Sequence, residues 1–385
     1  RVGVSTLPQR LGASSVVVIG IAGVVAVLVS MLAMGAGYQQ TLGRSGSADT
    51  AIVLRGGSAS EVSSVLDNAS TTVIAQAPGI ARDAAGKPIA SPELVVAANL
   101  PLNDGSGDEG SVQMRGVGEQ AWTLRPEVKI VSGRKFKPGL RELVVGKGAQ
   151  RQFAGLAPGR EIKLGSQVWT VAGVFESGNA MDSELWGDSN VVADTYRRGS
   201  SRTSVFVRLT SPAAYDAFKA ALAADPRLQV DTSTTLDYFR KQSEGVTKAI
   251  TIIGIVVGVI MAIGAVFGAL NTMFATVATR AREIATLRAI GFRGLPVVVA
   301  VMLETMLLAL LGGLVGGALA WLVFNGYSAS TLAQGTVGTL SFKLAVTPAL
   351  LWTGLKWALA IGFIGGLFPA VRAARLPVTT ALREL

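Results

Sequence analysis

The chain has 385 residues, half of them hydrophobic, and its mean hydropathy of +0.47 is high for a soluble protein of this length. It contains no Cys and no His, which excludes thiol chemistry, disulfides, and metal or acid–base sites that depend on His. The net charge of +10 would suit nucleic acid, but arginines beside apolar segments produce the excess, so we expect no nucleic-acid partner.

Four long apolar runs are predicted to span a membrane: residues 16–37, 249–279, 295–327 and 347–371. Each is at least as long as the ~20 residues that a bilayer requires. A cleaved signal peptide is the alternative for the first run, but that run is longer than the apolar core of such a peptide.

Basic residues gather in three short segments that flank these runs, residues 1–15, 280–294 and 372–385. They are Arg1, Arg10, Arg280, Arg282, Arg288, Arg293, Arg372, Arg375 and Arg383. Because positive charge marks the cytoplasmic side, we expect both termini and residues 280–294 in the cytoplasm of a bacterial inner membrane. Residues 38–248 and the short loop 328–346 then lie outside, in the periplasm.

Residues 38–248 are predicted to form a large α+β periplasmic domain, inserted between the first and second spans. Short β-rich runs recur at residues 51–55, 72–76, 93–98, 111–116, 142–145, 167–174 and 203–209. Helices are predicted at residues 58–68 and at 211–224, where Ser211 and Pro212 form a favourable helix start. Residues 231–248 are predicted to be helical and to continue into the second span.

The acidic, glycine-rich run at residues 103–110 is predicted to be a surface turn between two strands. It lacks the 12-residue ligand spacing of a calcium loop, so we expect no metal site there.

Glycines spaced four residues apart recur in the spans and predict close helix–helix contacts. The third span carries a doubled pair, Gly312/Gly316 and Gly313/Gly317, for which we favour a packing interface. The other pairs are Gly254/Gly258, Gly264/Gly268 and Gly362/Gly366.

Between the second and third spans lies a short charged segment, TRAREIATLRAIGFRG, at residues 279–294. Arg280 and Glu283 are three residues apart and are predicted to pair on one helical face. Ile284 and Leu287 give an apolar edge that could seat in a partner, and Gly291 is a suitable C-cap. The alternative is a simple inside loop whose arginines only set topology.

Two ionisable residues lie within apolar spans, Glu304 in the third and Lys356 in the fourth. Such groups are costly in a membrane unless they have partners, so a proton or substrate path is one interpretation. The interpretation we favour is structural: Glu304 meets the arginines of residues 280–294, while Lys356 extends toward the interface.

The sequence resembles the MacB/FtsX-type ABC transporter permeases along nearly its whole length. The run REIATLRAIGFRG looks like the coupling helix of that family, and MLETMLLALLGGLVGG follows with an early acid, Glu304. The ending LFPAVRAARLPVTTALREL is similar to the family's C-terminal motif. Two runs before the second span, GRKFKPGLRELVVGKGAQRQF and GREIKLGSQVWTVAGVF, are similar to the family's periplasmic core domain.

The resemblance implies four membrane helices, a periplasmic α+β domain, and a dimer of permeases on two cytoplasmic ABC ATPases. It implies that the segment of Arg280, Arg282, Glu283, Ile284, Leu287, Arg288 and Gly291 couples to the ATPase. No G-x-x-x-x-G-K-[ST] phosphate loop is present, so we expect ATP and Mg²⁺ on a separate ATPase chain and no cofactor here. ATP-driven closure would then move the periplasmic domains by mechanical transmission.

The expected function is export or extraction of a substrate, with a homodimer, a periplasmic adaptor and an outer-membrane channel as further partners. The alternatives are an FtsX-like regulator of cell-wall hydrolases and a Lol-type lipoprotein-releasing permease. No catalytic residues are predicted, so we expect a non-catalytic membrane subunit.

Overall fold

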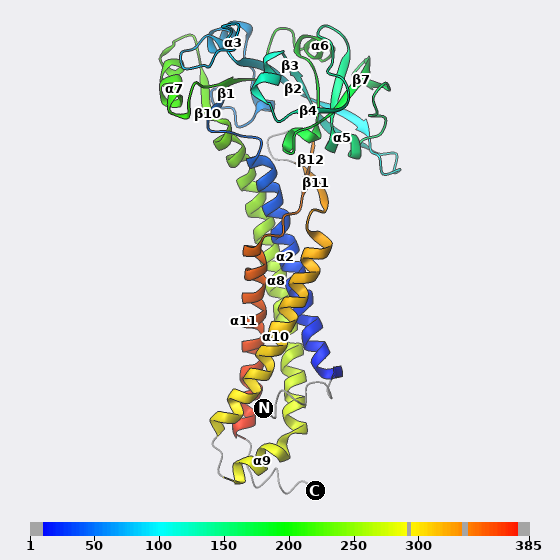
Figure 1. The fold of residues 1–385 in the computed structure, drawn as a ribbon, viewed down its shortest axis with the longest axis vertical. Coiled ribbons are helices and arrows are strands. Elements are labelled where there is room, and N and C mark those ends of the chain that lie inside the picture. The colour runs from blue at the N-terminus through cyan, green and yellow to red at the C-terminus, as the bar shows by residue number, and fades with distance from the viewer. Residues whose placement is uncertain (1–10, 291–293, 333–337, 376–385) are drawn as a thin grey trace. The chain divides into compact units, whose positions relative to one another are not determined.

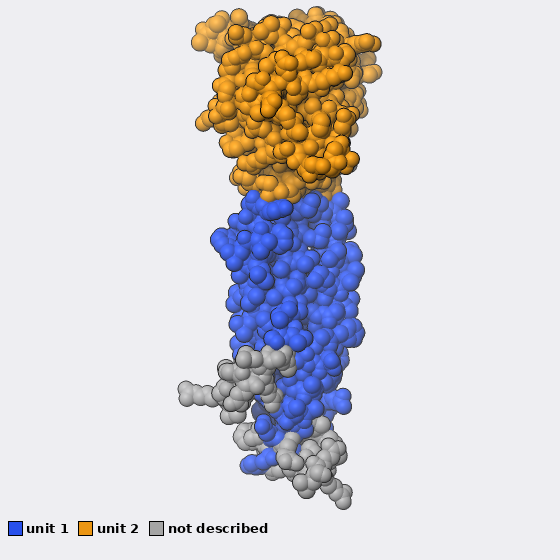
Figure 2. All heavy atoms as spheres, turned by 90° about the vertical axis from the view of Figure 1, so that its right-hand side faces the viewer, with its two compact units in different colours: residues 1–36, 248–327, 344–385 blue, residues 37–247, 328–343 orange. Residues whose placement is uncertain are grey.

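The computed structural model describes residues 11–290, 294–332 and 338–375. The chain divides into two compact units, coloured separately in Figure 2. We call residues 1–36, 248–327 and 344–385 the helical unit, and residues 37–247 and 328–343 the sheet domain.

Long apolar helices build the helical unit (Figure 1). Its elements are α2 (Leu11–Gly43), α8 (Thr235–Thr279), α9 (Ala281–Ala289), α10 (Gly294–Phe324) and α11 (Pro348–Arg375). The last residues of α2 and the first residues of α8 belong to the sheet domain. Within the described residues, four helices are long and apolar enough to cross a membrane, namely all of these except α9. Their shared core includes Val25, Leu308 and Ile361, each at most 3% exposed.

The sheet domain is built on a mixed sheet whose ten described strands follow the order β10-β1-β9-β2-β3-β8-β5-β7-β4, with β6 against β7. The strands are β1 (Thr50–Arg55), β2 (Ala90–Pro101), β3 (Glu109–Val117), β4 (Lys129–Gly133), β5 (Glu142–Gly146), β6 (Glu161–Leu164), β7 (Gln167–Glu176), β8 (Glu184–Asp188), β9 (Ser204–Arg208) and β10 (Val230–Thr234). The pairs β3–β8 and β5–β7 are parallel and the others antiparallel.

Short helices cover this sheet: α3 (Asn68–Ala75), α4 (Gln120–Leu124), α5 (Lys147–Gln152), α6 (Ser189–Thr195) and α7 (Tyr215–Ala224), with 3-10 turns η2 (Glu61–Ser63), η3 (Ala180–Ser183) and η4 (Pro212–Ala214). Helices α3 and α7 lie at the β1–β10 end and α5 and α6 toward the β7 end (Figure 1). This architecture confirms the predicted fold class of four apolar helices and a large domain of helices and strands between the first two.

Three local predictions are wrong in whole or in part. The helix predicted over residues 231–248 begins only at Thr235, because residues 231–234 pair with β1 as part of strand β10. Residues 72–76 lie mostly in α3, because Asp67 caps that helix by accepting from the Ser70 N–H at 2.6 Å and Ile74 is fully buried. Residues 58–67 form only η2, because the backbone at Leu66 exchanges hydrogen bonds with Arg202 and is held extended, and Asn68 already begins α3.

The segment expected to be a short loop between the third and fourth spans contains a hairpin, β11 (Ser328–Leu332) and β12 (Thr339–Lys343). It belongs to the sheet domain. The Ser341 N–H donates to the Ser183 hydroxyl at 2.9 Å, and the ring of Phe342 packs edge-on against Tyr38 at 5.5 Å. The hairpin is therefore docked on the domain through contacts that local sequence did not predict.

Candidate coupling site

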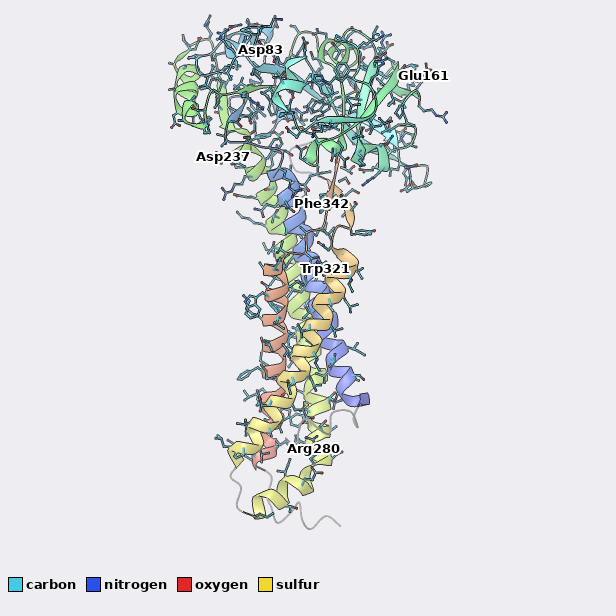
Figure 3. All side chains as sticks on the ribbon, in the orientation of Figure 1. Asp83, Glu161, Asp237, Arg280, Trp321 and Phe342 are labelled. Carbon is cyan, nitrogen blue, oxygen red and sulfur yellow. The ribbon has the colours of Figure 1, made fainter. Side chains whose placement is uncertain are left out.

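Helix α9 connects α8 to α10 and carries the charged segment that the sequence pattern indicated for coupling. Arg280 lies in the turn between α8 and α9 (Figure 3). Gly291 and the side chains of Arg282, Leu287 and Arg288 lie outside the described residues. The described part of the site comprises Arg280, Glu283, Ile284 and the residues that they meet.

Arg280 forms an ion pair with Glu304 of α10, with 2.9 Å between Nη1 and Oε2. The two side chains are 17% and 8% exposed. A buried carboxylate is costly without a partner, and this pair supplies one. The structural interpretation of Glu304 is thus the one that the contact supports.

The predicted pairing of Arg280 with Glu283 is wrong, since Glu283 is exposed and has no ion-pair partner in the part of the chain that the structure describes. The Arg280 carbonyl accepts from the Ile284 N–H at 3.0 Å, so Arg280 stands at the start of α9, but its guanidinium pairs with Glu304 of α10. An exposed pair would contribute little free energy, about 0–1 kcal/mol.

Ile284 is buried against helices of its own chain, so its side chain is not available to insert into a partner protein. It is 7% exposed and clusters with Met273 and Val277 of α8, with Val297 and Val301 of α10, and with Ala370 and Ala373 of α11. The apolar side of α9 therefore fixes this helix to three of the long helices. Among the α9 side chains that the structure describes, Glu283 and Thr286 are exposed.

The doubled glycine pair of α10 lies at two helix contacts. A Cβ on Gly312 would meet the Cβ of Ile21 at 2.9 Å, and one on Gly316 would clash with the carbonyl of Ala22. On the neighbouring face, a Cβ on Gly313 would lie 2.8 Å from Ala358 and one on Gly317 would lie 3.4 Å from Leu351. The first pair thus faces α2 and the second faces α11.

Helix α8 differs from the other long helices because much of its apolar surface is exposed. Only 11% of its most apolar window is buried, against 39–44% for the other three helices. A Cβ added to Gly264 or Gly268 would meet none of the described atoms within 4 Å, so both glycines face open space. Ile260 and Phe267 are 64% and 67% exposed on the same helix. Lys356 is likewise exposed, on α11.

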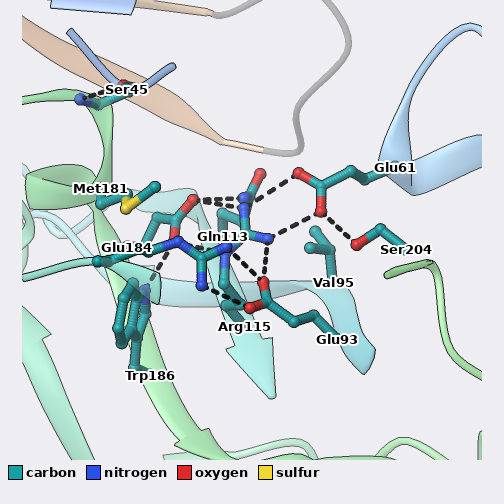
Figure 4. Close-up of polar contacts among 12 residues, drawn as sticks. Ser45, Glu61, Glu93, Val95, Gln113, Arg115, Met181, Glu184, Trp186 and Ser204 are labelled. Carbon is teal, nitrogen blue, oxygen red and sulfur yellow. Dashed lines mark hydrogen bonds and ion pairs between the residues drawn. The ribbon is translucent and has the colours of Figure 1, made fainter. Parts of the chain in front are cut away.

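The sheet domain contains a buried cluster of charges that the sequence patterns did not predict (Figure 4). Arg115 of β3 contacts three carboxylates, at 2.8 Å from Glu61, 2.9 Å from Glu93 and 2.8 Å from Glu184. Arg125 pairs with Glu93 through both of its terminal nitrogens, at 2.5 and 2.9 Å. The sequence did contain a sign of this cluster, because Glu93 and Arg115 are charged residues within runs that are otherwise typical of buried strands.

Electrostatics favour the charged forms of Glu93 and Arg115. Burial alone would raise the pKa of Glu93, but the charges of Arg125 and Arg115 outweigh it, so the pKa of Glu93 lies below its ordinary value. Burial opposes the charge of Arg115, yet the carboxylates of Glu184 and Glu61 raise its pKa well above the usual range. The cluster joins η2, β2, β3 and β8, and it is a structural element of the domain.

Two family models match the chain. The MacB-like periplasmic core domain matches residues 14–225, more than half of the sequence, and the FtsX-like permease C-terminal model matches residues 255–378. The chain belongs to the MacB/FtsX-type ABC transporter permeases. The α9 segment lies within the FtsX-like match, and the buried charge cluster lies within the MacB-like match.

Relatives of this MacB/FtsX-type permease include the macrolide export ATP-binding/permease proteins MacB of Bordetella avium and Escherichia coli. They are 28% and 25% identical, each over 96% of this chain. The chain spans 57% and 58% of the length of these relatives. The uncharacterized ABC transporter permease YknZ of Bacillus subtilis is 31% identical over 34% of this chain and 31% of its own.

Among solved structures, the periplasmic region of MacB from Actinobacillus actinomycetemcomitans is similar to this permease, with a TM-score of 0.37 and 14% identity. That similarity covers 52% of this chain and 92% of the other.

Proposed function

We propose that this chain is the permease subunit of a MacB-like ABC transporter in a bacterial inner membrane, with both termini in the cytoplasm. In this proposal an ABC ATPase on a partner chain binds ATP and Mg²⁺, and its closure moves the permease so that a substrate is exported or extracted. The observation that carries the proposal is α9, a short charged helix fixed between two membrane-length helices.

The contacts of α9 suit it to transmit force. Arg280 ties its start to α10 through Glu304, and Ile284 anchors it to α8, α10 and α11. A displacement of α9 therefore moves those helices with it, because packed cores resist compression. Helix α8 also contributes residues to the sheet domain, so movement of α8 reaches the domain along one unbroken helix.

A second copy of the chain is the proposed membrane partner. The exposed face of α8 carries two glycines that permit close approach of another helix, Gly264 and Gly268. Large apolar residues such as Phe267 flank them. The names of the MacB relatives describe macrolide export. We further propose a periplasmic adaptor and an outer-membrane channel as partners of this permease in export.

A charge reversal on α9 tests the coupling role. Glu283→Arg changes an exposed side chain and should leave membrane levels normal, since surface substitutions usually alter stability by within about 0.5 kcal/mol. If Glu283 contacts the ATPase, losing a buried interfacial pair costs about 2–5 kcal/mol, so we expect at least tenfold weaker ATPase retention. The measurements are co-purification from native membranes and ATP turnover of the purified complex.

The matched control is Glu161→Arg, which reverses an exposed charge in the sheet domain. This variant should retain the ATPase fully. Normal ATPase retention and normal turnover in Glu283→Arg would contradict the proposed docking at α9.

A further inference from the structure

A small basic pocket in the sheet domain has no role in the proposed coupling. Its volume is about 170 Å³, and the end of α2, helix α5, the turn before η3 and strand β12 line it. We call it the basic pocket. Its charged lining residues are Arg44, Lys147, Arg151, Lys343, Glu176 and Asp182.

Positive charge exceeds negative charge in this pocket. Lys147 already pairs with Glu176, with 2.8 Å between Nζ and Oε2. Arg44, Arg151 and Lys343 pair with no acid among the described residues. The hydrogen bond from Lys147, followed by the charges of Lys147, Lys343 and Arg151, lowers the pKa of Glu176 against the opposing effect of burial, so these three cations lie close enough to Glu176 to influence it.

Asp182 carries a negative charge in the pocket but forms no ion pair with the cations that the structure describes, because hydrogen bonds to the backbone hold its carboxylate. It accepts from the Ser177 N–H at 2.6 Å and from the Gly178 N–H at 3.0 Å. Within the described chain, the pocket thus holds three cations without acidic partners, on segments that are far apart in the sequence.

An unpaired buried donor also lines the pocket. Asn179 is 3% exposed, and its Oδ1 accepts from the Met181 N–H at 3.0 Å and from the Ser177 hydroxyl at 2.8 Å. The Met181 N–H can only donate, so it fixes which end of the amide is oxygen. Its Nδ2 has no hydrogen-bond partner among the residues that the structure describes. A buried donor without a partner is costly. Because Nδ2 itself has almost no accessible surface, a bound acceptor would remove that cost through a small shift of the Asn179 side chain toward the pocket.

We propose that the basic pocket binds a phosphate group. A phosphate offers several acceptor oxygens and up to two negative charges, which match the guanidinium and ammonium groups and the amide donor that line the pocket. The volume fits such a group and not a drug-sized molecule, which needs about 300 Å³ or more. The source is either a soluble phosphorylated anion or the headgroup of an anionic phospholipid.

The first experiment titrates inorganic phosphate into the full chain in neutral detergent at low salt, by calorimetry. Asn179→Asp keeps the acceptor that caps η3 but replaces the free donor with a negative charge. We expect this variant and the double variant Arg44→Gln/Lys343→Gln each to bind at least about tenfold more weakly, the effect of losing a charge-assisted hydrogen bond. Lys129→Gln/Lys163→Gln removes two exposed cations elsewhere in the domain and should leave binding within twofold.

The second experiment identifies the source of the phosphate. Native mass spectrometry of the chain released from nanodiscs would compare retained phosphatidylglycerol with phosphatidylcholine. A lipid site predicts phosphatidylglycerol retention that Asn179→Asp abolishes, whereas a site for a soluble anion predicts weaker phosphate binding with unchanged lipid retention. Equal phosphate affinity and equal lipid retention in wild type, Asn179→Asp and the double variant would overturn the proposal. Neither measurement involves ATP hydrolysis, so its outcome is independent of the transporter function.

Discussion

Buried charges in both units are paired with residues from other elements. Glu93 is fully buried between two guanidiniums, and Glu304 of α10 pairs with Arg280 from the turn between α8 and α9. Removing one member of a buried ion pair costs much more than removing an exposed one, because the other charge stays desolvated. These residues therefore permit sharp stability tests.

Glu93→Gln should destabilise the sheet domain by about 3–5 kcal/mol at neutral pH, because Arg125 and Arg115 would lose a shared carboxylate. Thermal unfolding followed by tryptophan fluorescence measures this effect. Glu161→Gln, at an exposed site, should shift stability by no more than about 0.5 kcal/mol.

The ion pairs of Glu93 also predict how the stability of the sheet domain depends on pH. The folded-state pKa of Glu93 lies below its ordinary value of 4.5, so its stabilising effect is complete above pH 4.5 and is lost as pH falls through the lowered pKa. The stability gap between wild type and Glu93→Gln should therefore narrow under acid conditions. A gap that stays constant from neutral pH to about pH 3 would contradict this assignment.

At the scale of elements, α10 packs tightly because its glycines admit neighbouring backbones on two sides. Gly312 and Gly316 face α2, and Gly313 and Gly317 face α11. Small residues at such contacts allow dispersion forces to act between helices in lipid, where the hydrophobic effect between them is absent.

Gly316→Leu should disrupt this packing. Its Cβ would clash with the carbonyl of Ala22 and lie 2.9 Å from Val25, and overpacking typically costs about 1–3 kcal/mol. Fluorescence-detected size-exclusion chromatography after heating should show a lower melting temperature. Gly20→Leu on α2 is the matched control, since none of the described atoms lies within 4 Å of the added Cβ, and an equal loss in both variants would refute the packing argument.

At the scale of the whole molecule, the distribution of arginines predicts which ends face the cytoplasm. The absence of native Cys makes a direct test possible. Ser106→Cys, in the exposed turn between β2 and β3, should react with an impermeant maleimide added to intact spheroplasts, whereas Thr286→Cys on α9 should react only after permeabilisation. The reverse labelling pattern would invert the topology and remove the basis for coupling at α9.

Local sequence determined the four apolar helices, most of the strands before the second span, and the charged segment that became α9. These features depend on composition and periodicity within a short stretch of sequence. A local apolar run or pattern is enough to predict them, because exposing apolar residues to water is unfavourable wherever they lie in the chain. The run at residues 72–76 shows where local sequence misleads, because a cap at Asp67 outweighed the β propensity of its residues.

Tertiary structure alone decided which groups meet. Arg280 pairs with Glu304 rather than with Glu283, Ile284 faces its own chain, and Arg115 gathers carboxylates from three separate segments. The physical reason is that a buried charge takes whichever partner the packed backbone brings within about 4 Å, and that choice depends on contacts far apart in the sequence.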